Sequence, residues 1–221
     1  MRITLPSGAP AEVALSPDAP TMGLVIAPDI FGLRPLYDSL VARFATEWGM
    51  AVCAVEPFPG LDLPPDIEPR VASVPNIDDE VHLRNLHEAA DHLAMAGVSR
   101  IALLGFCLGG MYCHKASRSD RFERIVSFYG MIRVPEAWRS PTQGEPLQYL
   151  GSGHAEHVLA IVGDLDHYTP AADVEALEAT GVTVVRYANA EHGFAHDVSR
   201  PAHRAADAAD AFGRAQAWFA S

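Results

Sequence analysis

The stretch 101-IALLGFCLGGMYC-113 places Cys107 between Gly105 and Gly109, directly after an apolar run. A β-rich run, a G-x-Cys-x-G turn and a second apolar segment together predict a strand, a sharp turn and a helix. The turn is strained, so the positions two residues on either side must carry almost no side chain if strand and helix are to approach. A buried structural cysteine in a Gly-lined turn is the alternative, because free cysteine is among the most buried residue types.

A cysteine on such a turn has two chemical advantages. It lies at a helix N-terminus, where the helix dipole and free N–H groups favour the thiolate. The N–H of Leu108 is then available to bind an oxyanion. Cys53, within a predicted strand, and Cys113, inside the predicted helix, lack the glycine setting and are interpreted as core residues.

Short β-rich runs alternate with helix-length segments along the chain. The runs are Thr21–Ala27, Met50–Val55, Arg100–Leu104, Arg124–Phe128, His157–Val162 and Val182–Tyr187, and most are too apolar to alternate, which is typical of a parallel sheet covered on both faces. The predicted helices are Pro35–Trp48, Ile77–Ala96, Leu108–Ser117, Ala171–Thr180 and Pro201–Phe219. This order predicts an α/β fold: a mostly parallel, doubly wound sheet flanked by helices, in a single domain spanning residues 1–221. Ligands of such sheets bind beyond the carboxyl ends of the strands.

Three further segments complete the predicted organisation. Ala11–Leu15 is expected to add an antiparallel edge strand. The segments Glu56–Pro75 and Gly130–Ala155 are rich in Pro and Gly, and we interpret both as irregular surface loops that could cover a site.

The composition narrows the class of partner. The chain has 221 residues, 49% of them hydrophobic, and a formal net charge of −12, which argues against nucleic acid because affinity for phosphates rests on Lys and Arg. The N-terminus lacks a signal-peptide apolar region, no apolar run approaches the roughly 20 residues of a membrane helix, and three cysteines form no paired framework. We therefore expect a cytoplasmic protein that binds a small molecule and neither nucleic acid nor membrane. The oligomeric state is not predicted by these features.

Two loops after later strands carry candidate partners for Cys107. The stretch 160-AIVGDLDHYTP-170 offers Asp166 and the stretch 187-YANAEHGFAHD-197 offers His192. The order nucleophile, acid, histidine is that of a nucleophile-elbow hydrolase, with His192 as base and Asp166 fixing its tautomer. Asp164 is the competing choice for the acid. A third loop, 26-IAPDIFGLRP-35, offers Asp29 and the N–H of Ile30.

Four motifs in order, PDIFG, GFCLGG, GDLDHYTP and AEHGFAH, cover about Ala27 to Phe194. With them the chain resembles the dienelactone hydrolases, the cysteine branch of the α/β-hydrolase fold. The resemblance implies hydrolysis of a small lactone or ester through a thiol acyl-enzyme, with Cys107 as nucleophile, His192 as base and Asp166 as orienting acid. It also implies that Ile30 and Leu108 supply the oxyanion N–H groups. No cofactor is required, because nucleophile, base and oxyanion donors are all protein groups.

Two positions depart from the pattern that the resemblance implies. Asp29 stands where the family normally carries a Glu that takes part in switching the thiol to thiolate, so Asp29 is the candidate for thiol activation. His196 stands where the type enzyme has an arginine that grips the substrate carboxylate. His196, Arg34, Arg133 and Arg200 are therefore candidate substrate contacts, and a neutral substrate is also compatible with the sequence.

Other classes of protein stay open or are disfavoured by spacing. A non-catalytic or thiol-sensing protein on the same fold is the alternative, motivated by Asp29 and His196. A class I glutamine amidotransferase would need His-x-Glu, whereas Gly193 and Phe194 follow His192. In 87-HEAADH-92 the histidines are five residues apart, roughly 140° around a helix, so they do not share a face as a zinc-protease motif requires. We expect no metal site.

Overall fold

The computed structural model describes residues 1–16 and 18–221, which form an eight-stranded sheet in the order β1-β2-β4-β3-β5-β6-β7-β8. The strands are β1 (Arg2–Thr4), β2 (Pro10–Ala14), β3 (Met22–Ala27), β4 (Ala51–Val55), β5 (Arg100–Phe106), β6 (Arg124–Phe128), β7 (Val158–Gly163) and β8 (Thr183–Tyr187). Pairing is parallel from β4 through β8, while β1 and β2 are antiparallel. The predicted mostly parallel sheet is confirmed. The run Ala11–Leu15 forms the antiparallel strand β2 as predicted, but β2 is not at the edge, because the unpredicted short strand β1 pairs along its outer side.

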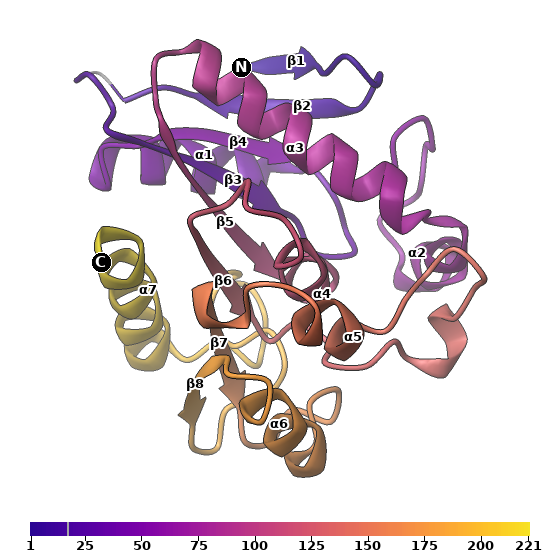
Figure 1. The fold of residues 1–221 in the computed structure, drawn as a ribbon. Coiled ribbons are helices and arrows are strands. Elements are labelled where there is room, and N and C mark those ends of the chain that lie inside the picture. Colours follow the sequence, from indigo (N-terminus) through magenta and orange to yellow (C-terminus); the bar gives the residue numbers. More distant parts are fainter. Residues whose placement is uncertain (17) are drawn as a thin grey trace.

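Helices cover both faces of this sheet (Figure 1). They are α1 (Pro35–Glu47), α2 (Ile67–Ser73), α3 (Asp79–Met95), α4 (Leu108–Ala116), α5 (Pro146–Gly151), α6 (Ala171–Glu178) and α7 (Ala205–Ala220), with short 3-10 turns at Val74–Asn76, Glu136–Trp138 and Ala155–His157. Buried residues of α3, α4 and α6 pack on one face, and those of α1 and α7 pack on the other. The predicted doubly wound arrangement is therefore confirmed.

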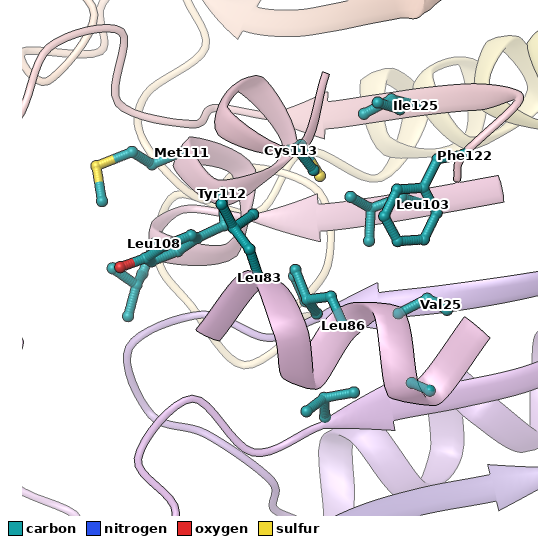
Figure 2. Packing of buried hydrophobic residues seen from close by; sticks show 14 of the residues in the cluster. Val25, Leu83, Leu86, Leu103, Leu108, Met111, Tyr112, Cys113, Phe122 and Ile125 are labelled. Atoms are coloured by element: carbon teal, nitrogen blue, oxygen red, sulfur yellow. The ribbon is translucent and has the colours of Figure 1, made fainter. Parts of the chain in front are cut away.

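The core on the α3 and α4 face explains two of the three cysteines. Figure 2 shows Cys113 among apolar side chains that include Leu103 and Ile125. Burial raises the pKa of Cys113 well above its usual range and that of Cys53 to about 12. Both cysteines are core residues, as predicted, and neither is disposed to ionise.

Two predictions about loops were wrong in part. Residues 56–75 contain α2 and residues 130–155 contain α5, so neither segment is wholly irregular. These helices have only seven and six residues, too few to show a 3.6-residue apolar period, and α2 buries none of its side chains. The last helix begins at Ala205 instead of Pro201, because Arg204 still bonds back to the carbonyl of Phe194.

Among residues 1–16 and 18–221, no helix is long and apolar enough to cross a bilayer.

Candidate active site

Cys107 occupies the turn between β5 and α4 with φ 55° and ψ −113°, a conformation that non-glycine residues rarely adopt. The turn is tight on both sides. A Cβ on Gly105 would lie 2.3 Å from the carbonyl oxygen of Gly109, and one on Gly109 would lie 1.9 Å from that of Ala27. The N–H of Cys107 donates to the carbonyl of Phe128 at 3.0 Å. Glycine at positions 105 and 109 is thus required by the close packing of the start of α4 against the ends of β5 and β3.

His192 and Asp166 meet at the same edge of the sheet. Nδ1 of His192 donates to Oδ2 of Asp166 at 2.7 Å, since a carboxylate can only accept. Oδ1 of Asp166 accepts from the N–H of Tyr168 at 2.9 Å, which fixes the carboxylate. Asp164, the competing choice, instead faces Arg186 at 3.1 Å on the exposed surface. The structure therefore pairs Asp166, not Asp164, with His192.

The free nitrogen of His192 faces a charged environment. Nε2 is buried and has no hydrogen-bond partner within the described part of the chain. Burial by itself lowers the pKa of His192, but the ionised sulfur of Cys107 and the carboxylate of Asp166 outweigh it and raise the pKa to about 10. The arrangement therefore favours the protonated form of His192.

The loop between β3 and α1 lies directly against this turn. Ile30 is buried, and neither its N–H nor that of Leu108 donates a hydrogen bond within the described residues. Leu108 opens α4, where first-turn N–H groups have no helical acceptor. Two unpaired N–H groups beside a nucleophile can stabilise an oxyanion.

A cavity of about 370 Å³ adjoins these groups. Its apolar wall consists of Ile30, Phe31, Ile67, Val71, Met131 and Trp138, and its polar lining consists of Cys107, Tyr168, His192, Asp197 and Arg200. The two segments interpreted as covering loops do contribute to it, Ile67 and Val71 from one and Met131 and Trp138 from the other. Its size and mostly apolar wall suit a small organic molecule.

Comparison with known proteins identifies the family of this chain. Residues 10–221 match the family described as the dienelactone hydrolase family. The chain belongs to this family. It is a dienelactone hydrolase-like hydrolase with the α/β-hydrolase fold, as its motifs and topology indicated.

Several proteins with functional names are similar to this chain. Carboxymethylenebutenolidase 2 of Cupriavidus pinatubonensis is 26% identical over 185 residues, which cover 80% of this chain and 75% of that protein. A carboxymethylenebutenolidase of Rhodococcus opacus is 26% identical over 84% of this chain and 75% of its own length. A provisionally named dienelactone hydrolase of Klebsiella pneumoniae has a crystal structure that superposes with a TM-score of 0.88 at 27% identity, over 100% of this chain and 98% of that one.

Within this member of the family, Asp29 is not free. Its two carboxylate oxygens accept from Arg34 at 2.6 and 2.9 Å, and Oδ2 also accepts from Nε2 of His196 at 2.7 Å. Burial would raise the pKa of Asp29, but these bonds hold it well below its usual range. The structure thus joins Asp29 to His196, two positions that sequence reasoning assigned to separate tasks.

Not all of the predicted substrate contacts reach the cavity. Arg34 pairs with Asp29, Arg133 pairs with Asp173 at 2.7 Å, and His196 is buried behind Asp29; among the described residues, none of the three lines the cavity. Arg200 does line it and forms no ion pair with the described residues.

Tyr168 also lines the cavity, with its ring edge-on to His192 at 4.8 Å. Sequence reasoning did not single out Tyr168, although its position two residues after Asp166 was a usable signal. His82, on α3, is buried against the ring of Tyr112.

One cluster outside the site has residue types that bind metals. His154, Glu156 and His157 place ligand atoms within 4.8 Å of one another. The two imidazole rings are stacked with only 17° between their planes, so their in-plane lone pairs do not converge on one point. This geometry does not suit a bound ion without rotation of both rings.

Proposed function

We propose that this protein hydrolyses a small lactone or carboxylic ester through a covalent thioester on Cys107, with His192 as proton carrier and Asp166 as its orienting acid. The observation that carries the proposal is Nε2 of His192, which has no hydrogen-bond partner among residues 1–16 and 18–221. Asp166 holds this imidazole in a cavity that it shares with Cys107. The names of the relatives, which are carboxymethylenebutenolidases, support lactone hydrolysis.

In the first half-reaction the ionised sulfur attacks the carbonyl carbon, forming a C–S bond. The carbonyl oxygen becomes an oxyanion that the N–H groups of Ile30 and Leu108 stabilise. Collapse breaks the C–O bond of the ester, and protonated His192 gives its Nε2 proton to the departing oxygen. From a lactone, that oxygen stays on the acyl chain as a hydroxyl.

In the second half-reaction water attacks the thioester. Neutral His192 takes a proton from the water, the tetrahedral intermediate breaks its C–S bond, and the acid product leaves. The sulfur departs as thiolate beside imidazolium, which restores the starting pair that the raised pKa of His192 favours. No group outside the protein, substrate and water is needed for the balance.

The substrate that suits the cavity is small, mostly apolar and anionic at one end. Arg200 is the candidate contact for that negative charge because it lines the cavity without an ion pair to the described residues. Asp197 also lines it, but its carboxylate faces Arg34 at 3.6 Å and accepts from Ser199. A reducing cytoplasmic location and a single-domain chain stay predictions, consistent with three free thiols and with helices packed on one sheet.

Intact-protein mass spectrometry during turnover of an activated acyl ester tests the proposal. We expect a transient mass increase of one acyl group, absent in Cys107→Ala and greatly slowed in His192→Ala. If Cys107 takes no acyl group yet reacts readily with an alkylating reagent, the thiol-sensing alternative replaces acyl transfer.

A further inference from the structure

The second aspartate–histidine pair of the molecule is closed to the cavity. His196 is 4% exposed and Asp29 is 1% exposed. The imidazole of His196 stacks on Phe106, with ring centroids 4.6 Å apart and 15° between the planes. Phe106 is the residue directly before Cys107, so this pair lies beneath the nucleophile turn and not in front of it.

Both nitrogens of His196 are occupied. Nε2 donates to Asp29, and burial lowers the pKa of His196, so its Nδ1 has a lone pair to share. The hydroxyl of Tyr129 therefore donates to Nδ1, at 2.6 Å, and its oxygen accepts from the backbone N–H of His196 at 3.3 Å. Tyr129, His196 and Asp29 thus form a hydrogen-bonded chain with one defined direction and no nitrogen left to carry a proton elsewhere.

At one end of this hydrogen-bonded series, Asp29 holds the loop after β3. Oδ1 of Asp29 accepts from the N–H of Phe31 at 3.0 Å, and the N–H of Asp29 donates to the hydroxyl of Tyr37 at 2.7 Å. Ile30 lies between these two anchored peptide units. On the far side, Glu56 accepts from the N–H of Leu33 at 2.8 Å. The direction of the Ile30 N–H is therefore set by bonds to Asp29 and its neighbours.

We propose that Asp29 and His196 are positioning residues, which hold the Ile30 N–H toward the oxyanion, and that Asp29 does not activate the thiol. The inference rests on the proposed acyl-transfer function. It replaces the role that the resemblance implied for Asp29, because both carboxylate oxygens are engaged by Arg34 and His196 and neither is bonded to Cys107.

Two reactions of Cys107 separate the roles. Acylation by an activated ester passes through an oxyanion, whereas alkylation by iodoacetamide needs only the thiolate. Asp29→Asn removes the charge and one strong acceptor, and we expect acylation to slow by about 10- to 100-fold, part of the cost of losing an oxyanion donor. The rate of alkylation against pH should stay within about 2-fold of the parent.

Two further variants test the same loop from other sides. Tyr129→Phe removes only the hydroxyl that donates to His196, and Glu56→Gln weakens the hold on Leu33 without touching His196. Both should slow acylation, by about 3- to 10-fold, and leave alkylation unchanged. Asp38→Asn, whose exposed carboxylate pairs with Arg2 at 2.6 Å, is the matched control and should change neither reaction.

Each outcome decides the proposal. If alkylation falls together with acylation in Asp29→Asn, the carboxylate activates the thiol and positioning is overturned. It is also overturned if both reactions of that variant match the parent. Should Asp29→Asn fail to fold, judged by its melting temperature, the result for Tyr129→Phe and Glu56→Gln decides in the same way. A parent protein that takes up no acyl group refutes the proposed function itself.

Discussion

Two buried aspartate–histidine pairs share the carboxyl edge of the sheet, and their bond lengths are the same. His192 donates to Asp166 at 2.7 Å, and His196, four residues later, donates to Asp29 at 2.7 Å. The ring of Tyr129 contacts both imidazoles, with centroids 5.3 and 5.7 Å away. The carboxylate bond alone therefore cannot tell which histidine carries protons.

The difference lies at the second nitrogen of each ring. Nε2 of His192 has no hydrogen-bond partner among the described residues and borders the cavity, whereas Nδ1 of His196 is occupied by the hydroxyl of Tyr129. The pKa values diverge accordingly: that of His192 is raised to about 10 and that of His196 is lowered by burial. An imidazole with one free nitrogen beside a thiolate can carry a proton, while one bonded at both nitrogens holds its neighbours in place.

The largest effect should come from breaking the carboxylate bond of His192. Asp166→Asn places an amide where the donating Nδ1–H needs an acceptor, which permits the wrong tautomer. We expect acylation of Cys107 to slow by about 10³-fold or more, the scale seen when the orienting carboxylate of such a triad is removed. Stopped-flow measurement of acylation checks this.

Asp164→Asn is the control for that variant, because it makes the same chemical change two residues away on a surface carboxylate paired with Arg186. Its acylation rate should equal that of the parent. Equal rates for the two variants would refute the role of Asp166.

The second prediction concerns the charge on the two imidazoles. In NMR titrations, His192 should stay protonated up to about pH 10, and His196 should be neutral from neutral pH upward. In Cys107→Ala the pKa of His192 should fall toward the ordinary histidine range, because the attraction of the ionised sulfur is lost while the bond to Asp166 remains.

The raised pKa of His192 also makes the stability of the fold depend on pH. Since the pKa of His192 is raised from 6.5 to about 10, its protonation stabilises the fold fully below about pH 6.5 and is lost as the pH rises through about 10. The alkaline loss of stability should therefore be smaller in Cys107→Ala. An unchanged His192 titration in this variant would contradict the thiolate–imidazolium pair.

Much of this site could be predicted from local sequence. The glycines around Cys107 reflect a steric requirement that five residues express by themselves, and strand order brings the loops of Asp166 and His192 to one edge. The pairing of Asp29 with His196 joins residues 167 positions apart in the chain. No local pattern encodes such a contact, so the two were interpreted separately.

The arginines show a second limit of sequence reasoning. Arg34, Arg133 and Arg200 have similar loop settings in the sequence, and only tertiary structure shows which of them are already paired with a carboxylate. Short helices pose the same difficulty: α2 contributes Ile67 and Val71 to the cavity and α5 packs against α4, and neither helix is long enough to show an apolar period.

A further predicted effect falls on substrate binding and not on the aspartate–histidine pairs. Arg200→Gln should raise KM for an ester that carries a carboxylate by about 10-fold, the cost of one charge-assisted hydrogen bond, and leave KM for the uncharged analogue nearly unchanged. The kcat of both esters should change little, because Arg200 touches neither Nδ1 of His192 nor Oδ2 of Asp166. Arg133→Gln, which breaks an exposed pair with Asp173, is the matched control and should leave both substrates unaffected. Equal changes for charged and uncharged esters would show that Arg200 shapes the cavity without recognising a negative charge. The division between a proton-carrying His192 and a positioning His196 does not depend on that result.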